Sequence, residues 1–294
     1  MKVCLVAVAI GDKYLERYNT LFRPSQEQYA SKHGYDFRVE TEYLDPRFQN
    51  KAVCSLNKIL VSCQPWSYQY DFVIFIDSDI VVNISSPPIH SCMDFEGKIG
   101  IVNEYDQLVG HEKFTDKVRE SLKWGTASEY YEKAGFYLST ELMLNTGVLV
   151  MQPALHGEFL RNIFDLHVET CLTHPRGFHY EQAAIGYHLQ TSNMFKILPK
   201  EFNAIWIIRK IIYHYMNYYE ALEILNVGIN KIIKRKVQNK RLETEYEIVN
   251  RIWNYFRENF FIHLASTQNY ERIPELMQIN TELSNNEDQS KGRS

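Results

Sequence analysis

Two carboxylates, Asp77 and Asp79, follow a short apolar run and could bind a metal ion. The run is Phe72–Ile76, and its β-branched and aromatic residues are typical of a strand covered on both faces. Residues two apart in an extended segment point to the same side, so both carboxylates are expected at the carboxyl edge of a sheet, where α/β proteins bind ligands. No basic residue adjoins them in the sequence. A divalent cation would offset their mutual repulsion, and the segment therefore predicts half of a metal site.

The same segment permits two other interpretations. Acidic pairs at strand ends often cap the next turn, and Ser86-Pro87-Pro88 has the composition of a turn. An apolar strand followed by DxDxV is also how aspartyl phosphatases of the haloacid dehalogenase type begin, in which case Asp77 would be a nucleophile. That chemistry needs a later acidic pair as a second metal anchor, and the sequence has none before its polar end. Metal binding is the favoured interpretation.

The composition is that of an enzyme-sized globular protein. The chain has 294 residues, of which 45% are hydrophobic and 14% aromatic, enough for one large domain or one domain with an insertion. Its net charge of −4 gives no general electrostatic attraction to nucleic acid. No apolar window approaches the roughly 18 residues that a membrane span needs. Sugar rings or bases often stack on aromatic side chains, although most of the Tyr and Phe residues are expected in the core.

Cysteine usage and the start of the chain predict a cytoplasmic protein. The five cysteines are an odd number without CxxC spacing, which argues against a disulfide framework and against a zinc site. The apolar start of the chain passes directly into Gly11-Asp12 without a cleavage site, so it predicts a first strand and not a signal peptide. A glycan on the sequon at Asn83 would crowd the Asp77–Asp79 segment, which also favours a reducing compartment.

Apolar runs with strand character alternate with stretches of helical spacing. This alternation predicts an α/β fold in which the first strands pair in parallel. The polar run 104–133 is expected to cover the cleft. Strands are expected at 3–10, 35–40, 72–76, 98–103, 142–152 and 194–198, with a last core strand at 260–265; helices are expected at 24–33 with Gly34 as C-cap, at 52–63, at 153–171 and at 178–190.

Asn145 and Thr146 form a polar pair inside the otherwise apolar strand 142–152. Buried polar groups need hydrogen-bond partners, so the pair is expected at a ligand or at a β-bulge. Gly147, which follows, allows close backbone approach.

The segment 207–259 differs in composition from the rest of the chain and is expected to form two or three inserted helices. Within it, 231–241 contains six basic residues and no acidic one. A solvated helix face is the favoured interpretation, and binding of an anionic acceptor or peripheral contact with a membrane is the alternative. The segment 274–294 is polar and expected to be disordered. The predicted catalytic domain therefore comprises 1–206 and 260–273.

Several short motifs occur in an order found in one known family. In this order they resemble the metal-dependent GT-A glycosyltransferases of the galactosyltransferase and mannosyltransferase family that includes plant xyloglucan xylosyltransferases. The resemblance covers about 1–206 and 260–268, and it rests on the order of the motifs, since each is weak alone. The motifs are Tyr29-Ala30, His33-Gly34-Tyr35, Asn57-Lys58, Asp77-Ser78-Asp79, Leu144-Asn145-Thr146-Gly147, Glu181-Gln182, Leu198-Pro199 with Phe202-Asn203, and Ile262-His263-Leu264-Ala265-Ser266.

The resemblance implies a GT-A fold, in which a Rossmann-like mixed sheet is flanked by helices, and transfer of a hexose or pentose from a nucleotide-sugar to a glycan or other hydroxyl acceptor with retention. UDP is the better candidate nucleotide, and GDP-mannose remains open. His263 would join Asp77 and Asp79 as a metal ligand. Two carboxylates and an imidazole shift the preference from Mg2+ toward Mn2+. A metal that bridges the diphosphate would stabilise the departing charge as a Lewis acid.

The resemblance also implies roles for further residues. Gln182 would lie against the far face of the sugar, where an amide oxygen stabilises an oxocarbenium-like transition state, and Glu181 would orient hydroxyl groups. The residues expected to bind the donor are Ala9, Ile10, Gly11, Tyr14, Lys58, Asp77, Ser78, Asn145 and Thr146.

The last motif departs from the family pattern. Ser266 replaces the family's glycine, and Thr267 and Gln268 stand where a lysine would clamp the diphosphate. Lys58 is a candidate substitute for that lysine. The departure also leaves open a third interpretation, a non-catalytic sugar-nucleotide-binding or glycan-binding protein.

Overall fold

The computed structural model describes residues 1–173, 180–226, 245–265, 273–274 and 276–277. Within these ranges, only the backbone is described for 217–226 and 245–249. The predictions for the basic block 231–241, for Ser266 and for most of the polar segment 274–294 therefore lie outside the described residues.

The centre of the fold is a six-stranded sheet with the strand order β2-β1-β3-β6-β5-β7. β2, β1 and β3 pair in parallel, which confirms the prediction for the first strands. β6 runs antiparallel to both of its neighbours, so the sheet as a whole is mixed. Its strands are β1 (Val3–Val8), β2 (Asp36–Glu40), β3 (Phe72–Ile76), β5 (Ile99–Asn103), β6 (Leu144–Met151) and β7 (Phe195–Ile197).

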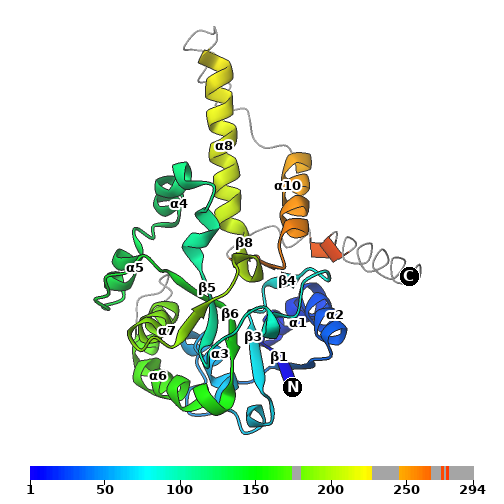
Figure 1. Ribbon diagram of the computed structural model, residues 1–294, viewed down its shortest axis with the longest axis vertical. Coiled ribbons are helices and arrows are strands. Elements are labelled where there is room, and N and C mark those ends of the chain that lie inside the picture. Colours follow the sequence, from blue (N-terminus) through cyan, green and yellow to red (C-terminus); the bar gives the residue numbers. More distant parts are fainter. Residues whose placement is uncertain (174–179, 227–244, 266–272, 275, 278–294) are drawn as a thin grey trace, which may run out of the picture.

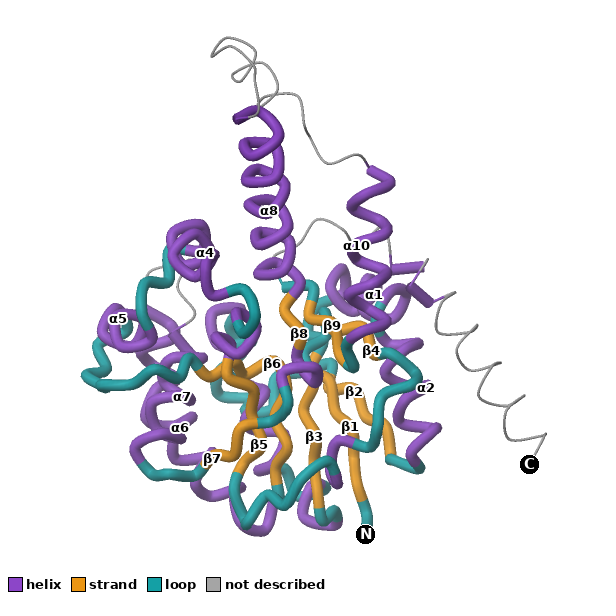
Figure 2. The backbone as a smooth tube through the Cα atoms, turned by 45° about the horizontal axis from the view of Figure 1, so that its top comes forward, coloured by secondary structure: helices purple, strands orange, loops and turns teal. Residues whose placement is uncertain are grey.

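Both faces of the sheet are covered, as Figure 2 shows. Alternate residues of β1 enter different hydrophobic clusters, because side chains of a strand point to opposite faces in turn. Leu5 and Ala7 pack in a cluster with residues of α1, α2 and α10, whereas Cys4 and Val6 pack in a cluster with residues of α3, α6 and α7. The helices are α1 (Asp12–Leu21), α2 (Arg23–His33), α3 (Asn57–Leu60), α4 (Thr115–Leu122), α5 (Ala127–Lys133), α6 (Pro153–Thr173), α7 (Tyr180–Thr191), α8 (Trp206–Asn226) and α10 (Glu245–Glu258).

The helix predicted at 52–63 is broken into short turns. Only α3 within it is α-helical, and 3-10 turns lie on either side. Asn57 donates a hydrogen bond to the Val53 carbonyl and accepts one from the Leu44 amide, and Ser62 donates to the Ile59 carbonyl. Such side-chain bonds to the backbone compete with a continuous helical ladder. α1 was not predicted, and only Tyr18 of that helix is fully buried.

A second, three-stranded sheet has the order β4-β9-β8. Its strands are β4 (Ile80–Val82), β8 (Ala204–Ile205) and β9 (Phe261–His263). The last core strand predicted at 260–265 is confirmed as the buried strand β9, which pairs with β4 and β8 and not with the central sheet. The direction of the chain changes after Asp77, so β3 and β4 enter different sheets and the acidic segment lies where the two sheets meet.

The polar pair in β6 lies at an irregularity, as predicted. Pairing between β5 and β6 jumps from Leu149, opposite Ile101, to Asn145, opposite Val102. The backbone around Thr146 is thus left out of the ladder with β5. The side chain of Asn145 bonds to Glu104 and Asn203, and that of Thr146 accepts a hydrogen bond from Lys58.

α8 and α10 project from the top of the molecule in Figure 1. They pack on the rest of the fold at their lower ends, where Ile208 of α8 and Phe256 of α10 are buried. After β9 the chain still contributes to the core, because Ile273 and Leu276 are buried. None of the helices in the described part of the chain combines the length and the apolar character of a membrane-spanning segment.

Candidate functional site

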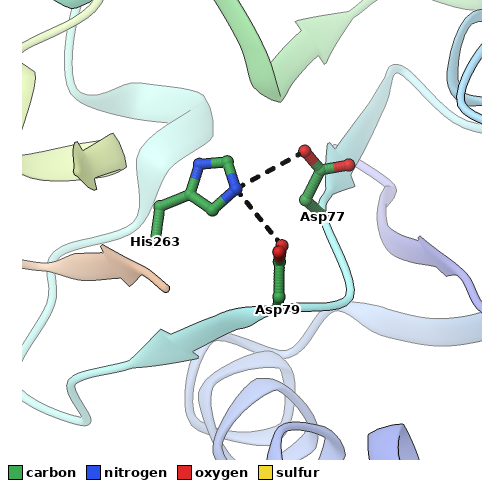
Figure 3. Close-up of side chains that lie close together, drawn as sticks. All are labelled: Asp77, Asp79 and His263. Carbon is green, nitrogen blue, oxygen red and sulfur yellow. Dashed lines mark ion pairs between the residues drawn. The ribbon is translucent and has the colours of Figure 1, made fainter. Parts of the chain in front are cut away.

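Asp77, Asp79 and His263 point toward one another at the carboxyl end of β3 (Figure 3). Nε2 of His263 lies 3.2 Å from Oδ1 of Asp79 and 3.8 Å from Oδ2 of Asp77. The pairing of β4 with β9 places Ile80 opposite His263, and the Leu264 amide donates to the Asp79 carbonyl at 3.0 Å. The backbone ladder of the second sheet therefore holds the imidazole beside the carboxylates.

The chemistry and spacing of this trio fit a divalent cation. One candidate ligand atom from each residue lies within 4.8 Å of the other two. An octahedral ion with ligands at about 2.1 Å holds neighbouring ligand atoms about 3.0 Å apart and opposite ones about 4.2 Å apart. Two carboxylates and one imidazole are suitable ligands for such an ion. The trio can therefore hold a metal with only small side-chain shifts.

Asn203 sets the tautomer of His263. Oδ1 of Asn203 lies 2.9 Å from Nδ1 of His263, and Nδ2 of Asn203 donates to Oδ1 of Asn145 at 2.7 Å. Since the asparagine oxygen is the acceptor, Nδ1 of the neutral imidazole carries the proton and Nε2 has the lone pair. That lone pair faces the two carboxylates, which is the arrangement that outer partners give to metal-binding histidines.

The carboxylates of the trio differ in their electrostatic surroundings. Burial raises the pKa of Asp77 above its ordinary value, although Lys58 and His263 oppose the change. Burial acts in the same direction on Asp79, but the adjacent His263 outweighs it and lowers the pKa of that carboxyl. Burial would lower the pKa of His263, yet Asp79 and Asp77 raise it. Asp79 is thus the carboxyl that stays ionised most readily.

Lys58, which was expected to bind the donor, is also a basic neighbour of Asp77. Its Nζ lies 3.2 Å from Oδ1 of Asp77 and donates to Oγ1 of Thr146 at 3.3 Å. The lysine side chain is only 7% exposed. The premise that no base neighbours the carboxylates is therefore wrong in three dimensions, because α3 brings Lys58 against the end of β3. The ammonium can balance Asp77 or bind a second anion in the cleft.

The trio lines a cleft of about 1510 Å³. Most residues expected to bind a donor line the same cleft, and Oγ of Ser78 donates to Oη of Tyr14 at 3.0 Å within it. Ala9 and Thr146 do not line it, because each is buried behind the wall. The expected donor and catalytic residues that line the cleft are Ile10, Gly11, Tyr14, Lys58, Asp77, Ser78, Asn145, Glu181 and Gln182.

Glu104 is a cleft residue that the sequence reasoning missed. It is 3% exposed, and its Oε2 accepts hydrogen bonds from Nδ2 of Asn145 at 3.1 Å and from Nε2 of Gln182 at 3.3 Å. Burial raises the pKa of Glu104 to about 7, against the lowering effect of these bonds. A signal for it existed, since Glu104 directly follows β5 and so lies at the same edge of the sheet as Asp77.

A continuous chain of hydrogen bonds joins the trio to Gln182. It runs from His263 to Asn203, then to Asn145, to Glu104 and to Gln182, with successive distances of 2.9, 2.7, 3.1 and 3.3 Å. The amide of Gln182 also donates to Oη of Tyr130 at 3.3 Å. The candidate metal ligand and the candidate catalytic residue are thus held by one network.

Gly147 allows the imidazole of His263 to approach β6. A Cβ atom at this position would lie 2.7 Å from Cε1 of His263 and 3.0 Å from Oδ1 of Asn145. The glycine carbonyl accepts a hydrogen bond from the Asp77 amide at 2.8 Å. A larger residue would push the imidazole away from the carboxylates, so the absence of a side chain here has a direct purpose.

Comparison with protein-family models found no match, and comparison with curated proteins found none. Comparison with solved structures found matches. One is a glycosyltransferase involved in the glycosylation of the major capsid of PBCV-1, with 14% identity over 95% of this chain and 100% of that one and a TM-score of 0.53. Another is the galactosyltransferase LgtC in complex with donor and acceptor sugar analogs, with 12% identity over 93% of this chain and 94% of that one and a TM-score of 0.46. With its mixed sheet flanked by helices, the chain has the fold of the GT-A glycosyltransferases.

Proposed function

We propose that this protein is a metal-dependent glycosyltransferase that moves a hexose or pentose from a nucleotide-sugar to a hydroxyl acceptor, with retention at the anomeric carbon. The observation that carries the proposal is the convergence of Asp77, Asp79 and His263 in a large cleft of a GT-A fold. Mn2+ is the proposed ion, with Mg2+ as the alternative, because an imidazole joins the carboxylates. When bound there, the ion would act as a Lewis acid on the departing diphosphate.

The donor would lie along the carboxyl edge of the sheet. Ile10, Gly11 and Tyr14, which follow β1, would contact the base and ribose of UDP. Lys58 would bind the diphosphate, because its ammonium is held within reach of Asp77, and a phosphate oxygen can share it. The side chain of Ser78, already bonded to Tyr14, would close this end of the site.

The sugar would lie at the Gln182 end of the cleft. Glu104 and Tyr130 hold the Gln182 amide nitrogen, so the amide is oriented before a substrate arrives. The oxygen of this amide would support positive charge on the ring as the glycosidic bond to phosphate breaks. Asn145 would contact sugar hydroxyls, and Thr146 behind it would support Lys58. Glu181 would orient the acceptor hydroxyl so that it attacks from the same face that the diphosphate leaves.

The proposal is tested by nucleotide release from a panel of UDP-sugars and GDP-mannose, with and without Mn2+. We expect turnover that requires the ion and falls at least about 100-fold in Asp79→Ala. The matched control is Asp116→Ala, since that carboxylate is 98% exposed and lies on α4. Full activity of Asp79→Ala, or activity unaffected by a chelator, would contradict the assignment.

The phosphatase interpretation is not favoured. It rested on an apolar strand followed by DxDxV, whereas the structure has the mixed sheet of a GT-A fold and pairs Asp77 with Lys58 and His263. The binding-protein interpretation is an outcome of the test, because Mn2+-dependent binding of UDP without turnover of any donor would establish it.

Two further parts of the proposal concern the domain division and the compartment. Residues 1–206 and 260–273 are proposed as the catalytic domain, and 207–259 as a helical insertion. All five cysteines are free thiols. Nδ2 of Asn83, the sequon residue, is buried and donates to the carbonyls of Phe256 and Asn259. Both observations support a reducing compartment such as the cytoplasm.

A further inference from the structure

The cleft has more room than a single small ligand requires. Its volume is about 1510 Å³, and sites for one small molecule or cofactor usually occupy about 300–1,000 Å³. The cleft also has two chemically different ends. Polar and charged residues that follow β1 and β3 line one end, and residues from the connection between α4 and α5 line the other. In Figure 1, α4 and α5 lie to the left of β5 and β6, and β3 and β1 lie to their right.

The second end of the cleft has an apolar wall formed by Leu122, Trp124, Ile205 and Ile207. Leu122 is the last residue of α4, Ile205 belongs to β8, and Ile207 lies in the first turn of α8. All four belong to one hydrophobic cluster, so they form a continuous surface. Trp124 contributes the largest side chain of this apolar wall.

The apolar wall adjoins the groups proposed to react. Ile205 lies opposite His263 in the pairing of β8 with β9. On the other side, the ring of Trp124 lies 6.4 Å from the ring of Tyr105, the residue after Glu104. The apolar wall is therefore near His263, a candidate metal ligand, and near Glu104, which accepts a hydrogen bond from Gln182. Ile10 and Tyr14, where the nucleotide is proposed to bind, follow β1, which lies on the side of β3 opposite β6.

The backbone around Trp124 is fixed before any ligand binds. Its amide donates to the Arg119 carbonyl at 3.1 Å, and its carbonyl accepts from Nζ of Lys133 at 3.0 Å. Oη of Tyr105 donates to the next carbonyl, that of Gly125, at 2.6 Å. An aromatic side chain held in this way offers a large contact area at little entropic cost on binding.

We propose that Trp124 is the platform of the acceptor subsite and that the acceptor is a carbohydrate whose pyranose ring stacks on the indole. This inference rests on the proposed glycosyl transfer. One face of a pyranose carries C–H bonds and suits an aromatic ring, while its rim of hydroxyls needs polar partners. Glu104 and Glu181 supply such partners at the same end of the cleft. Because Ile207 belongs to α8, the helical insertion takes part in this subsite.

The test is saturation-transfer NMR with methyl β-D-galactoside, methyl β-D-glucoside and methyl α-D-mannoside, in the presence of UDP and Mg2+, which unlike Mn2+ is diamagnetic. We expect saturation of ring C–H protons of at least one glycoside with the wild-type protein. The signal should fall at least 5-fold in Trp124→Leu, which keeps apolar bulk, and should persist in Trp124→Phe, which keeps an aromatic face. Trp66→Leu is the matched control, since Trp66 packs near Arg38 and does not line the cleft.

The affinity for UDP, measured in the same samples by calorimetry, separates the outcomes. Unchanged UDP affinity together with a lost glycoside signal in Trp124→Leu supports the proposal. A glycoside signal that survives Trp124→Leu, or no signal from any glycoside with a wild-type protein that binds UDP, overturns it. A large loss of UDP affinity in Trp124→Leu that is absent in Trp124→Phe would mean that the base stacks on Trp124, which also overturns it. Failure of the wild-type protein to bind any nucleotide would instead contradict the proposed function itself.

Discussion

The Nδ1 atom of His263 lies 2.9 Å from Oδ1 of Asn203, a residue from a segment far from the acidic pair in sequence. This contact leaves Nε2 directed at Asp77 and Asp79. The Phe202-Asn203 motif had no role assigned from the sequence, and the structure places its asparagine directly behind the candidate metal ligand. Because Asn203 also donates a hydrogen bond to Asn145, it connects the orientation of the imidazole to the other hydrogen-bonded residues of the cleft.

Asn203→Ala is expected to weaken Mn2+ binding by about 10- to 100-fold, because the imidazole loses the partner that fixes its tautomer. Calorimetric titration with Mn2+ measures the affinity. Asn203→Asp keeps an oxygen acceptor for Nδ1 and should lose less Mn2+ affinity than Asn203→Ala. Asn259→Ala, which removes a different buried asparagine, is the control. Equal Mn2+ affinities in Asn203→Ala and the wild type would contradict this role.

Glu104→Gln is expected to change how stability depends on pH. Because the folded-state pKa of Glu104 is raised from 4.5 to about 7, its stabilising effect is complete below pH 4.5 and is lost as the pH rises to about 7. The neutral amide escapes this loss. The free energy of unfolding of the variant, relative to the wild type, should therefore rise by about 3 kcal/mol between pH 4.5 and pH 8. Urea unfolding across this range measures it.

The control for that measurement is Glu158→Gln, a substitution at an exposed position of α6. This substitution also removes one acidic side chain, but from an exposed position, so it separates the effect of burial from the change in net charge. A stability difference between Glu104→Gln and the wild type that does not vary with pH would mean that the Glu104 carboxyl is not protonated near neutrality in the folded chain.

Lys58→Met is expected to make the protein depend more strongly on metal for stability. The substitution keeps the aliphatic stem but leaves Asp77 without its ammonium partner, which should cost about 2–3 kcal/mol in the absence of metal. A bound Mn2+ would restore positive charge near Asp77, so saturating Mn2+ should raise the melting temperature more in Lys58→Met than in the wild type. Thermal unfolding with and without Mn2+ measures this. Lys98→Met is the control, and equal metal-induced shifts in Lys58→Met and the wild type would refute the relationship.

Much of the fold could be predicted from the sequence because its signals are local. The apolar runs that form β1, β3, β5 and β6 were recognised, and the polar pair Asn145-Thr146 correctly indicated a bulge. The motif order also named all three members of the trio that the structure brings together. These predictions depend on residues adjacent in the chain or on the order of motifs.

What could not be predicted depends on pairings between distant segments. No local pattern places Lys58 against Asp77, because that contact follows from how α3 packs beside β3. Likewise, the role of Asn203 follows from its approach to His263 and Asn145, which requires both sheets. The pairing of β9 with β4 and β8 in a separate sheet could not be predicted for the same reason, since strand character does not specify the partner.

The pairing of β4 with β9 has a consequence for biosynthesis. During translation the acidic segment emerges from the ribosome long before the strand that carries His263, and such distant pairing is slow to form because a long intervening loop must be closed. A nascent chain that has not reached residue 263 therefore lacks one of the three candidate ligands. Metal acquisition would accordingly be a late event, and it would link β9 to structure that formed early.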